Sequence, residues 1–225
     1  MSDQILTPLQ FETFSEVVNI AVGKAAETLS MMIERKILID VPKIELLNQT
    51  QLVARFEECF GKQALAVSIG YQGLLSGKAT LFFEATEGKN LVDQLLAVNA
   101  DDDWDDWDDD EPSGSEYGFT DSDKEAIIEV GNLMINALLG SVGNLVGGQM
   151  HYSPPALTMD FIFHEEFSSA QQDSQAFLIE AVFQEQETKI KGLLSIHFEL
   201  GDFLGSFLTQ LDQLHESFSS DDDQF

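Results

Sequence analysis

The chain has few positive charges and almost no cysteine. Its 225 residues include 11 Lys and Arg against 40 Asp and Glu, which gives a formal net charge of -29 at pH 7. Such a charge repels a phosphate backbone and an anionic lipid surface, and therefore argues against nucleic acid and membrane as partners. The single cysteine, Cys59, cannot form an internal disulfide.

Targeting segments and common catalytic motifs are also missing. No signal peptide is recognisable and no apolar run of membrane-spanning length stands out, so we expect a cytoplasmic protein without membrane insertion. Motifs for metal binding, nucleophilic catalysis and glycine-rich phosphate loops are absent, and we expect no metal site and no cofactor of the protein's own. The four histidines are scattered along the chain: His151, His164, His197 and His215.

Acidic residues gather in two places. Residues 101–111 (DDDWDDWDDDE) hold nine of them, and a shorter DDD cluster lies near the C-terminus. Blocks of like charge usually stay solvated, which predicts an acidic linker over residues 101–118 and an acidic tail over residues 216–225. We expect the linker to be mobile and dispensable for folding. The other interpretation is that Trp104 and Trp107 dock a partner.

An internal repeat lies on either side of the linker. In each copy a Glu is followed three residues later by an Asn, and 22 residues separate that Asn from a proline. The matching residues are Glu16, Asn19 and Pro42 in the first copy, and Glu129, Asn132 and Pro155 in the second. Both copies lie in long predicted helices, residues 8–35 and 123–147, whose starts carry capping patterns at residues 7–10 and 122–125.

Runs of branched and aromatic residues follow each proline and predict three strands per half. They read LVARF, ALAVSIGY and ATLFFE, then ALTMDFIF, AFLIEAVF and LLSIHFE. A shorter helix closes each half, over residues 88–98 and 201–215. Consecutive strands joined by short turns pair antiparallel, and small sheets leave open edges. We therefore expect an α/β fold, a pseudo-twofold duplication of helix–three strands–helix units that share one antiparallel sheet. Residues 1–100 and 119–215 are then two repeats of a single domain.

A polar stripe recurs on the two predicted motif helices, because residues three and four apart share a helix face. It comprises Glu12, Glu16, Asn19 and Gly23 in the first and Glu125, Glu129, Asn132 and Asn136 in the second. A solvated face explains a lone Glu. Asn is unfavourable inside a helix, because its side chain competes for backbone hydrogen bonds. The matching Asn residues therefore indicate either a functional site or a buried bond to the neighbouring repeat.

These residues resemble the motif of the CheC/CheX/FliY family of chemotaxis phosphatases, which is Asp or Ser, three residues, Glu, two residues, Asn, 22 residues, Pro. The Glu, Asn and Pro positions match in both copies. Both copies depart at the first position, where Glu12 and Glu125 retain a carboxylate on a longer side chain. The two-copy plan is more similar to CheC-type members than to the single-motif CheX type.

The resemblance implies a phosphatase that hydrolyses the aspartyl-phosphate of a CheY-like receiver domain, with Mg²⁺ and the phosphate-binding groups supplied by the receiver. The motif Asn would orient the attacking water without bringing a negative charge beside the phosphoryl group. The motif Glu would dock beside the receiver's lysine. The implied catalytic residues are Glu16, Asn19, Glu129 and Asn132, with Glu12, Pro42, Glu125 and Pro155 in support.

Two other functions stay open at the level of sequence. One is a non-catalytic adaptor that binds a receiver, a CheD-like receptor deamidase or the flagellar motor. The other is an acidic scaffold in which only the Trp-bearing linker binds. Intact Asn residues in both copies favour the enzyme, because an adaptor has no need of them.

Overall fold

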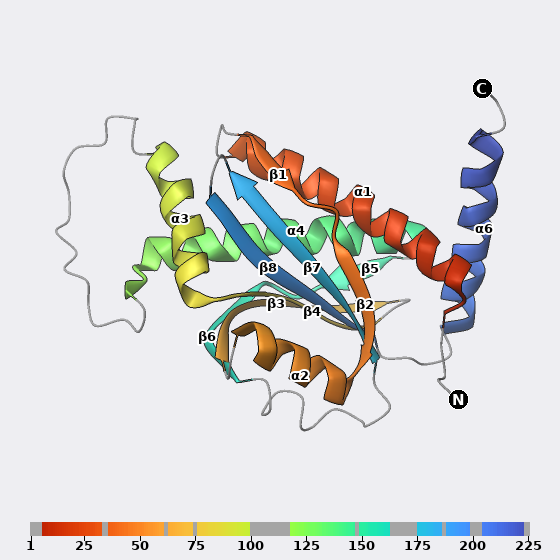
Figure 1. Ribbon diagram of the computed structural model, residues 1–225, viewed down its shortest axis with the longest axis horizontal. Coiled ribbons are helices and arrows are strands. Elements are labelled where there is room, and N and C mark those ends of the chain that lie inside the picture. The colour runs from red at the N-terminus through yellow and green to blue at the C-terminus, as the bar shows by residue number, and fades with distance from the viewer. Residues whose placement is uncertain are drawn as a thin grey trace.

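The computed structural model describes residues 6–32, 36–60, 63–73, 76–99, 118–146, 149–162, 175–185, 188–198 and 204–222. These residues form five helices and eight strands (Figure 1). The first half contains α1 (Pro8–Met32), β1 (Ile37–Ile39), β2 (Lys43–Asn48), α2 (Gln49–Phe60), β3 (Gln63–Gly73), β4 (Gly77–Phe83) and α3 (Ala85–Asn99). The second half contains α4 (Asp121–Val146), β5 (Met150–Tyr152), β6 (Ala156–Ile162), β7 (Gln175–Glu185), β8 (Thr188–Phe198) and α6 (Leu204–Asp222).

All eight strands belong to one sheet, in the order β1-β7-β8-β4-β3-β5, with β2 also paired to β7 and β6 to β3. Every pairing is antiparallel. The prediction of an α/β duplication that shares one antiparallel sheet is confirmed. The halves also exchange their edge strands, since β1 and β2 pair with β7 of the second half, while β5 and β6 pair with β3 of the first.

The halves meet at the centre of the sheet, where β4 pairs with β8. Residues 77–83 run opposite residues 198–192, and Thr80 lies opposite Ser195 at the midpoint. Because Thr80 and Ser195 occupy the same place in their respective strands, the pseudo-twofold axis passes between them.

The prediction that LVARF is a strand is wrong, and the predicted count of three strands per half holds only when β1 with β2, and β5 with β6, are each counted as one interrupted edge strand. Residues 52–56 lie inside α2, and each half has four strands among the described residues, because two short edge strands precede the longer ones. Leu52 and Phe56 are four residues apart and fully buried, so the run is the apolar face of an amphipathic helix. The signal for this helix is a capping box, in which the Asn48 and Gln51 side chains each accept a hydrogen bond of 3.0 Å from the other's backbone N–H.

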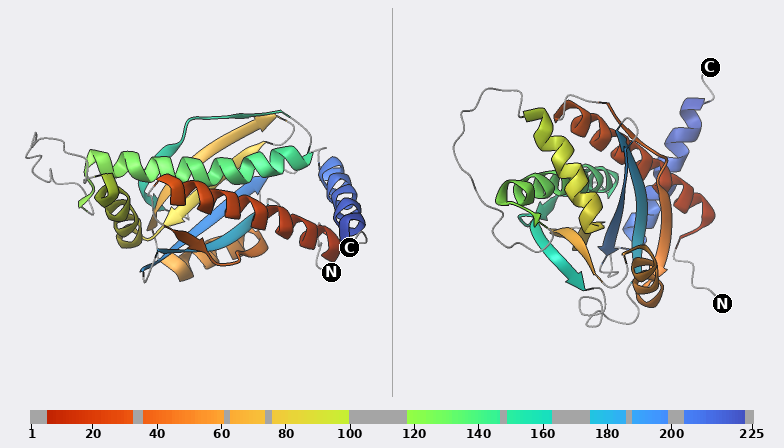
Figure 2. Two further views of the ribbon diagram at one scale, coloured as in Figure 1. Left: turned by 90° about the horizontal axis from the view of Figure 1, so that it is seen from above. Right: turned by 60° about the vertical axis from the view of Figure 1, so that its left-hand side comes forward.

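Helix α2 packs on the face of the sheet away from α1 and α4 (Figures 1 and 2). Its Arg55 ties it to two strands through carboxylates. Arg55 Nη2 lies 2.8 Å from Glu180 of β7, and Arg55 Nε lies 3.8 Å from Glu45 of β2. The Arg55 side chain therefore links α2 to β2 of its own half and to β7 of the other half, the strand with which β2 pairs.

Most predicted helix boundaries shift by a few residues. Helix α4 begins at Asp121, two residues before its predicted start, and α6 spans Leu204–Asp222 where residues 201–215 were expected. The internal repeat explains why α4 begins early: its N-terminal cap is Thr120, which lies 113 positions after Thr7, the cap of α1. The same offset separates the motif residues.

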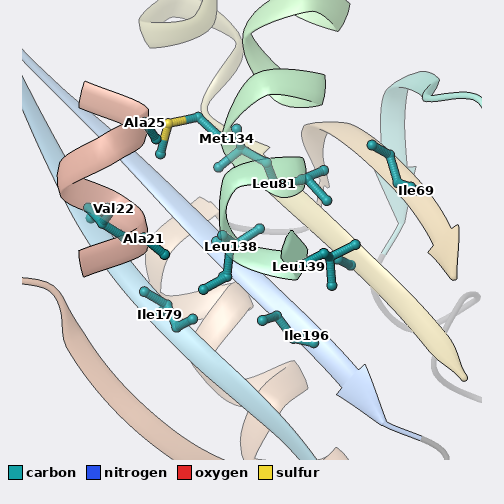
Figure 3. Close-up of a cluster of buried hydrophobic side chains, with 14 of the residues drawn as sticks. Ala21, Val22, Ala25, Ile69, Leu81, Met134, Leu138, Leu139, Ile179 and Ile196 are labelled. Atoms are coloured by element: carbon teal, nitrogen blue, oxygen red, sulfur yellow. The ribbon is translucent and has the colours of Figure 1, made fainter. Parts of the chain in front are cut away.

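The main core lies between the sheet and helices α1 and α4, which run side by side across one face (Figures 1 and 2). Ala21, Val22 and Ala25 of α1 and Met134, Leu138 and Leu139 of α4 meet Ile69, Leu81, Ile179 and Ile196 of the sheet (Figure 3). Burial of these side chains stabilises the helices on the sheet.

Helix α4 corrects the expectation that no apolar stretch reaches membrane-spanning length. Residues 121–144 are long enough and, with a mean hydropathy of 1.5, apolar enough to cross a membrane, and half of the stretch is buried inside the fold. Its apolar residues pack against α1 and the sheet. The hydropathy of α4 therefore follows from its place in the core.

The predicted acidic linker lies, apart from Gly118, outside the described residues. Its mobility, its dispensability and the docking role of its two tryptophans stay predictions.

Gly131 sets how closely α4 approaches the sheet. A Cβ atom at this position would lie 2.5 Å from Val67 Cγ1 of β3, which is fully buried. Gly140, two to three turns later in the same helix, has no atom within 4 Å of a Cβ position.

We predict that Gly131→Ala lowers the free energy of unfolding by about 1–3 kcal/mol through overpacking. Gly140→Ala should raise it by about 0.5–1 kcal/mol, since alanine is the better helix former. Urea unfolding of both variants tests the contact. Equal effects at the two positions would contradict it, and Val67→Ala should partly rescue Gly131→Ala.

Candidate functional site

The two motif helices present the same polar stripe to solvent. Glu12 and Glu16 of α1 are exposed and Asn19 is half-buried. On α4, Glu125 and Glu129 are exposed and Asn132 is half-buried in the same order. The opposite faces of both helices are buried in the core, as at Phe14 and Ile127. The stripes therefore lie on the outer surface of the helical layer, as the sequence predicts.

The start of each motif helix is fixed by a capping box. The Thr7 N–H donates to Gln10 Oε1 at 3.0 Å, and the Gln10 N–H donates to Thr7 Oγ1 at 3.2 Å. Thr120 and Asp123 make the equivalent pair, at 2.7 and 3.2 Å. The cap predicted at Thr7 is confirmed, and the one predicted at Ser122 is wrong by two residues.

The closing helix of the opposite half braces each cap. Gln10 Nε2 donates to Asp212 Oδ1 of α6 at 3.0 Å. On α4, Asp123 Oδ2 lies 3.3 Å from Lys89 Nζ of α3, and Lys89 also pairs with the exposed Asp93. Each motif helix is therefore held by its own cap and by a helix from the other repeat.

Ionisation of Asp123 is favoured despite its burial. Burial opposes the charged form, but the hydrogen bonds from Thr120 and the ammonium of Lys89 outweigh it and hold the pKa of Asp123 below its ordinary value. The pKa of Lys89 is raised, chiefly by its hydrogen bond to Asp93. Burial lowers this pKa, but the carboxylate of Asp123 raises it further.

The two motif prolines occupy matching irregularities in the edge strands. Residues 40–42 stand opposite the two β7 residues Ala181 and Val182, so β1 and β2 are one edge strand broken by an extra residue. Residues 153–155 interrupt β5 and β6 in the same way, opposite β3. Pro42 and Pro155 end these bulges, where a missing N–H costs no ladder bond.

The two copies differ one turn after the Asn. Asn136 Nδ2 donates a hydrogen bond of 2.7 Å to Asn132 Oδ1. Gly23 holds the equivalent position in α1, where a Cβ would have no neighbour within 4 Å. Asn136 was recognised from the sequence as part of the stripe, but its bond to Asn132 was not.

No group of three or more His, Cys, Asp and Glu side chains suited to a metal ion occurs in the portion of the chain that the structure describes. Each stripe instead offers carboxylate oxygens and a carboxamide on an exposed helix surface. Such a surface can orient a water and pair with a cation on a docked partner.

Comparison with known proteins gives a similarity in sequence to a curated relative and a similarity in fold to several solved structures. No family model matches the chain. A curated relative, the CheY-P phosphatase CheC of Bacillus subtilis (strain 168), is 26% identical over 154 residues. The match covers 67% of this chain and 66% of the relative, just under two thirds of its length.

Solved structures share the fold. FliY of Thermotoga maritima aligns with a TM-score of 0.68 at 20% identity, over 93% of this chain and 98% of that one. The FliM middle domain of H. pylori aligns with a TM-score of 0.61 at 9% identity, over 91% and 99% of the two chains.

We predict that Asp123→Asn lowers the free energy of unfolding at pH 7 by about 1–3 kcal/mol, because it removes the charge that binds the cap and Lys89. A lowered pKa stabilises the fold above the ordinary Asp pKa, and this stabilisation is lost as pH falls through the folded-state value. The deficit of the variant should therefore shrink towards about pH 3.

The matched control is Asp93→Asn, which removes the exposed partner of the same lysine. It should cost less than about 1 kcal/mol. Urea unfolding of both variants across this pH range decides the point, and a deficit for Asp123→Asn that persists unchanged in acid would contradict the assignment.

Proposed function

Since the chain fits the CheC/CheX/FliY-type family, we propose that it is a phosphatase that hydrolyses the aspartyl-phosphate of a CheY-like receiver domain. The observation that carries the proposal is the repeated stripe, in which exposed Glu and half-buried Asn recur in one order on α1 and α4. The Bacillus subtilis relative is a CheY-P phosphatase, which supports the same reaction.

The proposed roles of Asn19 and Asn132 follow from the chemistry of phosphoryl transfer. A water attacks phosphorus, the bond from phosphorus to the aspartyl oxygen breaks, and inorganic phosphate and the free carboxylate result. Placing that water in line is the main demand on the enzyme. A carboxamide can hold the water by hydrogen bonding, whereas a carboxylate there would repel the phosphoryl oxygens.

Glu16 and Glu129 precede the Asn residues by one turn and are exposed. We assign them to docking, because a surface carboxylate can pair with the lysine of the receiver and so seat the Asn beside the phosphoryl group. Glu12 and Glu125 extend the same acidic edge by another turn.

The receiver is proposed to bring the divalent cation, Mg²⁺, to the complex as part of the substrate. The protein then acts in the cytoplasm, where receivers and receptors meet. Pro42 and Pro155 are given a supporting role through the edge strands that they shape.

The fold likeness to FliM favours one second candidate. The FliM middle domain of H. pylori has the same architecture, and the second candidate is a protein that binds a receiver, a CheD-like deamidase or the flagellar motor without turnover. Phosphate release separates the two candidates, because an adaptor binds the receiver and leaves its phosphorylation lifetime unchanged.

We predict that the Asn19→Ala/Asn132→Ala variant folds normally and loses about 100-fold or more of its turnover. The measurement is phosphate release from a phosphorylated CheY-like receiver with Mg²⁺. The control is Asn90→Ala/Asn144→Ala, which removes two exposed helix Asn residues and should keep full activity. Full activity in the motif variant would refute the catalytic assignment.

We also predict that Glu16→Gln/Glu129→Gln weakens binding of the phosphorylated receiver about two- to fivefold at low salt. Added salt should reduce the defect, because it screens the ion pair. Glu57→Gln, an exposed Glu on α2 at the other face of the sheet, is the control. Unchanged affinity at both salt concentrations would show that the motif Glu is not an interface contact.

A further inference from the structure

The two copies of the motif are chemically unequal. The side-chain oxygen of Asn132 accepts a hydrogen bond from Asn136, at 2.7 Å, from one turn along the same helix. The structure shows no hydrogen bond to the Asn19 side chain within the described residues. Its neighbour one turn along is Gly23, which has no side chain.

The bond selects one orientation of a carboxamide that otherwise has two. The terminal torsion of Asn is broad and nearly two-fold, so oxygen and nitrogen can exchange places. A donor beside Oδ1 favours the orientation in which Oδ1 faces Asn136. The Nδ2 group and the second lone pair of Oδ1 are then left for a water. Both side chains are half-buried, which limits competition from solvent.

From this contact we infer that Asn136 is a positioning residue for Asn132, and that the second copy of the motif turns over faster than the first. The inference rests on the proposed function. Orientation established during folding need not be established again in each catalytic cycle, so its effect falls on kcat. Asn136 does not touch the reacting atoms in this account.

A bond that only stabilises the helix predicts a different result. Pairs four residues apart commonly add a little to helix stability, and in that case loss of the donor changes unfolding without changing kcat. Asn136→Leu separates the two accounts, because leucine has a similar shape, is a better helix former and has no donor. Asn136→Gln keeps a donor on a longer side chain.

The experiment measures each copy alone. An Asn19→Ala background reports the second copy, and an Asn132→Ala background reports the first. In the Asn19→Ala background, Asn136→Leu should lower kcat about three- to tenfold with KM unchanged, the effect of losing one hydrogen bond. Asn136→Gln should restore part of the rate. Asn144→Leu, at an exposed Asn in the same helix, is the control and should keep the parent rate.

The reverse change introduces the corresponding hydrogen-bond donor into α1. In the Asn132→Ala background, Gly23→Asn supplies a donor one turn after Asn19, in a position with room for it. This variant should raise the kcat of the first copy by a similar factor. An unchanged kcat in both Asn136→Leu and Gly23→Asn overturns the inference.

A spectroscopic measurement tests the bond without turnover. The side-chain amide protons of Asn136 should shift and exchange faster in Asn132→Ala, while those of Asn144 stay unchanged. Unmoved Asn136 resonances overturn the inference whatever the activity. No phosphate release from the unsubstituted protein overturns the proposed function and the role of Asn136 in turnover, while phosphate release that is indifferent to Asn136 overturns the inference alone.

Discussion

The exchange of edge strands between the two repeats is the constraint on which the rest of the structure depends. Each repeat ends its own part of the sheet at β3 or β7, and the missing neighbour comes from the other repeat. Without the other half, the outer sides of β3 and β7 would leave a long row of backbone groups without partners. The central pairing of β4 with β8 then fixes the two motif helices as a pair.

The backbone of the two repeats is symmetric, but the side chains that hold α1 and α4 in place are not. Gln10 and Asp123 cap equivalent helices, but one reaches an aspartate and the other a lysine in the opposite repeat. Val18 and Gly131 are equivalent positions, and only the glycine allows the close approach to Val67. The two helices are therefore held on the sheet by different contacts, which leaves each copy of the motif free to differ in chemistry.

Local patterns predicted the long helices, most of the longer strands and the shared sheet. These patterns predicted a strand where α2 lies, because the apolar residues of LVARF fit both a strand and the buried face of a helix. The capping box at Asn48, which marks the helix start, was not recognised. They also could not show which strands pair across the repeats, since that pairing depends on contacts far apart in the chain. The stripe residues were found because their spacing repeats, whereas the bond between Asn132 and Asn136 depends on side-chain orientation, which spacing does not specify.

The contact that places α4 on the sheet also places the motif. Gly131 lies between the buried Val130 and the half-buried Asn132, so its approach to β3 determines how far the carboxamide stands above the sheet. A larger residue at 131 would lift this turn of the helix and move Asn132 with it. A displacement of about 1 Å is enough to disturb alignment of a reacting water. Packing at the sheet and chemistry at the surface are thus joined through one residue, and the glycine is required at a position where α1 carries a valine.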